Sequence, residues 1–155
     1  LLRRHTFAPE TLPAREVGRL EVALPMEKLF VNDTERKGAF VHYELRDART
    51  KALITELTDY AARTKELRLP RTKAGDFTLK TTRRAGTLFI DIQSKTLLKD
   101  AYIDLGETGW QLSDNFLDIL PGRRYRLRAT RRQNAPACTT TALPTVTLRS
   151  ITTAE

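Results

Sequence analysis

The chain has 155 residues, of which 40% are hydrophobic and 30% are charged. This balance excludes an extended disordered chain and fits one ordinary domain, or one small domain with part of another. There are 27 Lys and Arg against 19 Asp and Glu, for a net charge of +8. Because the basic residues spread from Arg3 to Arg149 without a dense run, nucleic acid is not an expected partner.

The cysteine content excludes a disulfide-stapled or Cys-based zinc domain, and the apolar runs are too short for a membrane helix. Cys138 is the only cysteine, so neither an internal disulfide nor a Cys-based zinc site can form. No apolar run reaches the ~20 residues of a membrane helix, and the charged start at Leu1 lacks the apolar region of a signal peptide. Since position 1 is not Met, we expect a fragment or a processed product of a longer protein.

The first part of the chain alternates between apolar and polar residues, which is typical of half-buried strands. Residues 1–16 contain prolines and little periodicity, and we interpret them as a lead-in or linker. Strands are then expected at Arg19 to Leu24 and at Lys28 to Val31, the latter ending in an Asn32-Asp33-Thr34 turn. Another strand is expected at Phe40 to Arg46.

The segment from Lys51 to Lys65 carries mixed signals. Leucines at helical spacing favour a helix, whereas β-branched residues and flanking strands favour a strand with a loop, which we prefer. A short strand is expected at Glu66 to Leu69, before Pro70.

A second set of strands follows a polar stretch. Expected strands are Phe77 to Lys80, Thr87 to Ile92, Ala101 to Leu105, Arg124 to Ala129 and Thr145 to Ile151. The inward-facing positions are expected to be Leu88, Ile90, Ile92, Tyr125, Leu127 and Ala129.

About ten short strands with regular turn signals predict an all-β fold, an immunoglobulin-like antiparallel β-sandwich, either alone or preceded by part of a second β-sandwich. The expected organisation is a lead-in over 1–16, partial or extended immunoglobulin-like strands over 17–72, and a C-terminal immunoglobulin-like domain over 73–155.

The segment from Trp110 to Gly122 gathers the most specific cues. Glu107, Asp114 and Asp118 lie near Trp110, and paired carboxylates beside an aromatic ring suit glycoside chemistry. Asp and Asn before a buried Phe116 more often brace a tight turn. Asp114, Asn115 and Asp118 are therefore predicted to be structural, and no catalytic residue is assigned.

Other chemistry has less support. The Asp114 to Asp118 run has too few oxygens for calcium, and we expect neither a metal nor a cofactor. His5 and His42 have no triad spacing and are predicted to be structural or exposed. Trp110 is the single tryptophan and a candidate for stacking on a sugar ring, with a core or interface role as the alternative.

Tyr125 follows Pro121 and Gly122 at the spacing of a tyrosine corner, in which a Tyr hydroxyl bonds back across a turn between strands of a sandwich. This pattern supports the immunoglobulin-like fold and indicates no catalysis.

The run from Leu112 to Gly122 resembles a segment of the C-terminal immunoglobulin-like domain of β-mannosidases, in glycoside hydrolase family two. Upstream, Gly86 to Ile103 is similar to a strand pair of that domain, and Val146 to Ile151 to its final strand. Leu29 to Thr34, with the following strand, is similar to part of the preceding domain. Leu117 replaces an aromatic residue of the family pattern.

The resemblance implies an accessory β-sandwich without catalytic residues, at the C-terminus of a retaining enzyme that hydrolyses terminal β-D-mannosyl residues. Its implied partners are the other domains of that enzyme, and it slightly favours a secreted or periplasmic location. The (β/α)8 barrel that holds the family's catalytic glutamates needs ~250 residues of its own. Two alternatives stay open: a carbohydrate-binding module that contacts an oligosaccharide through Trp110, and a fibronectin-type protein-interaction domain.

The predicted role of Asp114 in holding the tight turn can be tested. Replacing Asp114 by Ala is expected to destabilise the domain by about 1–3 kcal/mol, because buried backbone donors would lose their acceptor. Thermal melting of the variant measures this loss, and an unchanged melting temperature would contradict a structural role for Asp114 in the turn.

Overall fold

The computed structural model describes residues 6, 29–106, 109–133 and 143–153, in two compact units, Leu1–Leu67 and Arg68–Glu155. The expected strand from Arg19 to Leu24 and most of the expected lead-in lie outside the described residues. Within the described part of the chain, no helix is long and apolar enough to cross a membrane.

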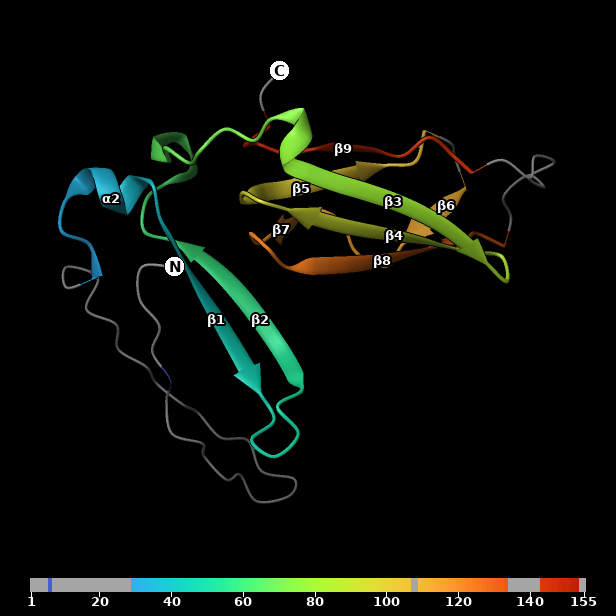
Figure 1. The fold of residues 1–155 in the computed structure, drawn as a ribbon, viewed down its shortest axis with the longest axis horizontal. Coiled ribbons are helices and arrows are strands. Elements are labelled where there is room, and N and C mark those ends of the chain that lie inside the picture. The colour runs from blue at the N-terminus through green and yellow to red at the C-terminus, as the bar shows by residue number, and fades with distance from the viewer. Residues whose placement is uncertain (1–5, 7–28, 107–108, 134–142, 154–155) are drawn as a thin grey trace. The chain divides into compact units, whose positions relative to one another are not determined.

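The described part of the first unit is a helix and a β-hairpin (Figure 1). Helix α2 spans Asp33–Lys37, and strands β1, Phe40–Arg46, and β2, Leu53–Tyr60, pair antiparallel. A single 3-10 turn, η1, spans Thr64–Glu66. The preference for a strand over a helix after Lys51 is therefore confirmed.

Two expected features of this unit are wrong. The described residues Leu29 to Val31 form no strand, and the Asn32-Asp33-Thr34 run begins a helix rather than a turn. The Asn32 side chain accepts a hydrogen bond from the Glu35 amide at 2.9 Å, so it caps the first turn of α2. Asn with Glu three residues later is a known helix-start pattern, and it outweighed the turn propensity of the same residues.

The strand expected from Glu66 to Leu69 is also absent. Glu66 ends η1, and Leu67 has extended dihedral angles, φ −61° and ψ 136°, without belonging to a strand. The apolar and polar alternation from Glu66 to Leu69 therefore indicates an extended backbone. An extended segment becomes a strand only where a neighbouring strand supplies hydrogen bonds.

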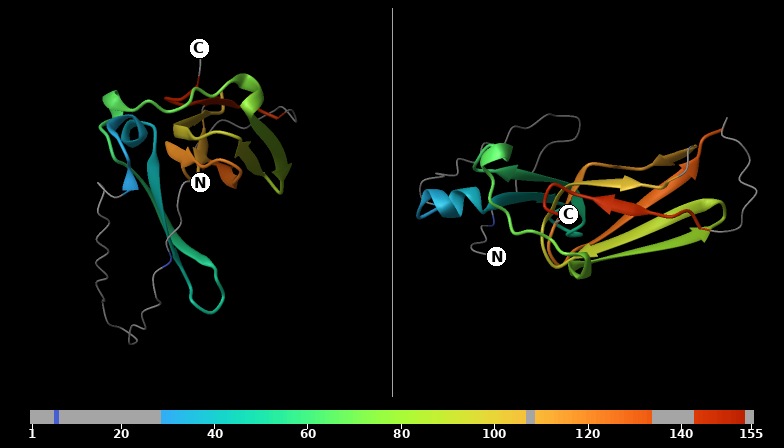
Figure 2. Two further views of the ribbon diagram at one scale, coloured as in Figure 1. Left: turned by 60° about the vertical axis from the view of Figure 1, so that its left-hand side comes forward. Right: turned by 90° about the horizontal axis from the view of Figure 1, so that it is seen from above.

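The second unit is a sandwich of two antiparallel sheets (Figure 2). One sheet has the order β3-β4-β8-β6 and the other the order β7-β5-β9, which confirms the all-β class. After a 3-10 turn, η2, at Ala74–Asp76, the strands are β3 Phe77–Arg84, β4 Thr87–Ser94, β5 Leu98–Asp104, β6 Trp110–Leu112, β7 Leu117–Ile119, β8 Arg124–Arg131 and β9 Thr147–Arg149.

The core lies between the two sheets and follows the predicted alternation. Leu88, Ile90 and Ile92 of β4 are at most 1% exposed, and Leu127 and Ala129 of β8 are also buried. They pack in one cluster with residues of the other sheet, namely Leu98, Ala101, Ile103 and Ile119. Tyr125 is half-buried against this cluster.

An ion pair crosses the outer face of the larger sheet. Arg126 of β8 lies opposite Asp91 of β4, and its Nε and Nη2 donate to the two carboxylate oxygens at 2.6 and 2.9 Å. The hydrogen bonds from Arg126 hold the pKa of Asp91 below its ordinary value, and the carboxylate raises the pKa of Arg126. Because both groups are solvent-exposed, the pair fixes register more than it adds stability.

A buried hydroxyl network joins the two ends of the second unit. Thr72 donates its amide to the Thr152 carbonyl at 2.7 Å, and the two residues are 0% and 3% exposed. The Thr152 hydroxyl donates to the Leu97 carbonyl at 2.8 Å and accepts from the Lys99 amide at 3.3 Å. These bonds tie the last described residues to the start of β5.

We predict that Thr152→Val lowers the free energy of unfolding by about 1–3 kcal/mol, because the buried Leu97 carbonyl and Lys99 amide would lose the Thr152 hydroxyl, and the Leu97 carbonyl would keep the longer 3.4 Å bond from the Thr72 hydroxyl. Thr147→Val, at an exposed position of β9, is the matched control and is expected to change little. Urea unfolding of both variants measures the difference. Equal midpoints would contradict a structural role for the network.

Candidate functional site

The segment singled out in the sequence connects the two sheets. It runs from β6 at the edge of the larger sheet, through β7 of the smaller sheet, to the beginning of β8. Neither β6 nor β7 is evident from alternation, because each has only three residues. Polar side chains between these strands hold the crossing in place.

Asn115 binds the neighbouring strand through both ends of its amide. Its Oδ1 accepts from the Ile103 amide at 2.8 Å, and its Nδ2 donates to the Ile103 carbonyl at 3.1 Å. Ala101 of β5 pairs with Leu117 of β7, so two residues further along this register Ile103 lies opposite Asn115. The side chain therefore continues the ladder where the backbone of β7 no longer does.

Asp118 supports an irregularity in the same strand. Its Oδ1 accepts from the Asp100 amide at 2.9 Å, at the point where the β5–β7 register shifts. Asp100 has a positive φ of 50°, a conformation that non-glycine residues adopt at a cost. The carboxylate therefore satisfies a backbone donor that the bulge removes from the ladder.

Asp114 and Phe116 differ from their predicted roles. Asp114 is exposed and accepts from the amide of its neighbour Asn115 at 2.8 Å. Phe116 is 66% exposed rather than buried, has a φ of 59°, and places its ring 5.1 Å from that of Tyr102. Among the described residues Asp114 holds the Asn115 amide in a solvent-exposed contact, so a smaller loss of stability is expected for Asp114→Ala than for a change at Asn115.

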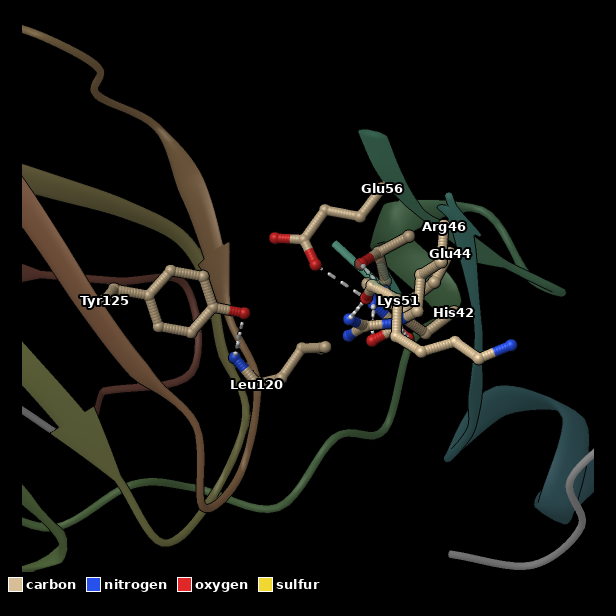
Figure 3. Close-up of polar contacts among 8 residues, drawn as sticks. His42, Glu44, Arg46, Lys51, Glu56, Leu120 and Tyr125 are labelled. Carbon is tan, nitrogen blue, oxygen red and sulfur yellow. Dashed lines mark hydrogen bonds and ion pairs between the residues drawn. The ribbon is translucent and has the colours of Figure 1, made fainter. Parts of the chain in front are cut away.

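The turn before β8 has the geometry of a tyrosine corner. The Tyr125 hydroxyl accepts from the Leu120 amide at 3.2 Å (Figure 3). Gly122 has a φ of 75°, which favours glycine, and donates its amide to the Ser94 carbonyl at 2.7 Å. Pro121 forms an isolated bridge with Ser94, so this turn is attached to the end of β4.

Trp110 lies in strand β6 and not in a loop. Its half-buried ring packs against the core, and the guanidinium groups of Arg83 and Arg131 lie 5.8 and 5.2 Å from the ring centroid. Cations at such distances are attracted to the face of an indole. The surroundings of the ring are thus apolar side chains and two cations, while Glu107 lies outside the described residues.

The sequence reasoning missed one cluster of ionisable side chains. His42 of β1 lies 3.6 Å from Glu44 and 3.3 Å from Glu56 (Figure 3). Glu44 is on the same strand, and Glu56 is its direct partner on β2. Only the hairpin register, which the spacing of the two strands does not fix, brings the second glutamate to the histidine. His5 lies outside the described residues.

We predict that Asn115→Asp lowers the free energy of unfolding by about 1–3 kcal/mol, because a carboxylate can accept from the Ile103 amide but cannot donate to its carbonyl. Asp114→Asn makes the reverse exchange at the adjacent exposed position and is expected to have little effect. Chemical denaturation monitored at Trp110 measures both. Equal losses, or a larger loss at Asp114, would contradict the assigned role of Asn115.

Comparisons with known proteins agree with this geometry. Residues 69–154, more than half of the chain, match the family model of the mannosidase Ig-fold domain. Among solved structures, a β-D-mannosidase from Dictyoglomus thermophilum aligns with a TM-score of 0.57 and 18% identity, over 80% of this chain and 14% of that chain. A search of curated protein sequences finds no match. The resemblance noted in the sequence is therefore confirmed, and the chain belongs to the family of mannosidase Ig-fold domains.

Proposed function

We propose that this chain supplies a non-catalytic accessory β-sandwich to a β-mannosidase-like glycoside hydrolase and supports its catalytic barrel. The observation that carries the proposal is the family match over residues 69–154. The chain also spans only 14% of the Dictyoglomus β-D-mannosidase that it resembles in fold, so that enzyme has many residues outside the shared part. In this proposal the partners of the chain are the other domains of its parent enzyme.

The contacts of the carboxylates favour a supporting role. Asp118 holds the Asp100 amide, Asp100 contacts the Lys99 ammonium at 2.9 Å, and Asp104 accepts from the Gly106 amide at 2.9 Å. Each carboxylate therefore stabilises the strands or turns around β5. A glycosidase carboxylate must instead reach the glycosidic oxygen or the anomeric carbon of a bound sugar.

The position of Trp110 favours the same function over the carbohydrate-binding alternative. Its half-buried ring packs against core side chains and lies near two guanidinium groups, which is the environment of an anchor residue. In the proposed function Trp110 anchors the edge strand β6 to the core.

The purified 155-residue chain is expected to release no aryl alcohol from an aryl β-mannoside above the rate of buffer alone, because the proposed catalytic groups belong to other parts of the parent. A colorimetric assay with the full enzyme of a related organism as positive control measures this. Turnover above background would contradict the proposal. Saturable quenching of Trp110 fluorescence by mannan oligosaccharides would favour a carbohydrate-binding module instead.

A further inference from the structure

We propose that His42, Glu44 and Glu56 bind a divalent transition-metal ion of the Zn²⁺ type, which clips strand β1 to strand β2. The three side chains lie on one face of the hairpin, and one ligand atom from each lies within 4.8 Å of the others. One imidazole nitrogen with two carboxylate oxygens is a donor set that Zn²⁺ accepts.

Two of the three separations between the donor atoms fit a tetrahedral ion. Two ligand atoms that each lie about 2.1 Å from a tetrahedral Zn²⁺ are about 3.4 Å apart. His42 Nε2 lies 3.3 Å from Glu56 Oε2 and 3.6 Å from Glu44 Oε1. An ion between the imidazole and either carboxylate would therefore lie within bonding distance of both groups.

A further contact orients the imidazole. His42 Nδ1 lies 3.1 Å from the hydroxyl of Thr58, its direct partner on β2. With Nδ1–H donating to this hydroxyl, Nε2 presents its lone pair to the two carboxylates. Metal-binding histidines are commonly fixed in this way through the nitrogen that does not bind the metal.

The charges of the cluster also favour a cation. Glu44 and Glu56 lie directly opposite each other across the hairpin, an arrangement of like charges that costs stability. Arg46 donates to Glu44 Oε2 at 2.7 Å, which leaves Glu44 Oε1 as the atom nearest the His42 imidazole. The side chain of His42 is 17% exposed, and Glu44 and Glu56 are exposed residues, so an ion can reach all three groups from solvent.

The ion would add to the stability of the hairpin. A two-stranded hairpin rarely folds stably in water without further strands or packing. An ion that binds only the folded hairpin adds the free energy of its binding to folding. Its ligands come from both strands, and so it would hold the register in which Glu44 opposes Glu56.

The test is calorimetric titration of ZnCl2 into the metal-free full chain, with Cys138→Ser as the background so that the thiol does not compete. We expect saturable binding of one ion per chain below millimolar concentration, and a higher melting temperature with Zn²⁺. Mg²⁺ is expected to have no comparable effect, because it requires near-octahedral oxygen ligation. Absence of saturable binding would overturn the proposal.

Two matched pairs of variants locate the site. His42→Gln is expected to weaken binding at least tenfold, whereas His5→Gln, at the other histidine of the chain, leaves it unchanged. Glu56→Gln should weaken binding and Asp59→Asn, on the opposite face of β2, should not. Thr58→Val removes only the orienting hydroxyl and is expected to weaken binding about 10- to 100-fold. Equal affinities within either pair would overturn the site.

A measurement on the unsubstituted chain avoids variants that fail to fold. In ¹⁵N-detected imidazole spectra, Zn²⁺ is expected to shift the Nε2 resonance of His42 and to leave that of His5 in place. A shift confined to His5 would show that the ion binds elsewhere and would overturn the proposal.

Discussion

The two hydrogen bonds between the Asn115 side chain and the backbone of Ile103 decide how the smaller sheet of the sandwich ends. Strand β7 has only three residues, yet β5 beside it has seven. Ile103 is 2% exposed, so its amide and carbonyl need partners within the protein. An amide side chain can donate and accept at once, and a carboxylate cannot.

Side chains in the segment from Trp110 to Gly122 form hydrogen bonds that a neighbouring strand backbone would otherwise supply. This explains why the segment is rich in polar residues although it crosses between two sheets. Asn115 continues the ladder, Asp118 supports the bulge at Asp100, and Tyr125 binds the Leu120 amide at the next turn. The buried hydroxyl of Thr152 does the same for backbone groups at the beginning of β5. The second unit is thus held by polar contacts at its connections and by an apolar core between its sheets.

Much of the second unit follows from period-two alternation, because β4 and β8 are long enough to show it and bury every second residue. The three-residue strands β6 and β7 could not be found in this way. Asn115, Asp118 and Tyr125 were recognised as structural, but their partners depend on tertiary register. Asp114 was given too much weight because local turn propensity does not show which carboxylate faces a buried donor.

In the first unit the local signals conflicted. Asn32 has both turn and helix-cap propensity. In the structure its side chain accepts from the Glu35 amide and caps a helix. His42 was judged alone, as a single histidine on a strand. The cluster with Glu44 and Glu56 exists because the hairpin register places the two glutamates opposite each other, and this information is absent from either strand alone.

The most direct test of the central claim is native-state amide hydrogen exchange at Ile103, followed by NMR in the unsubstituted chain. If the Asn115 side chain accepts from this amide, Ile103 should exchange as slowly as interior amides of β4 such as that of Ile90, through opening of the whole sandwich. Exchange at the rate of a solvent-exposed edge amide would contradict the account, because it would show that the ladder ends at Ala101.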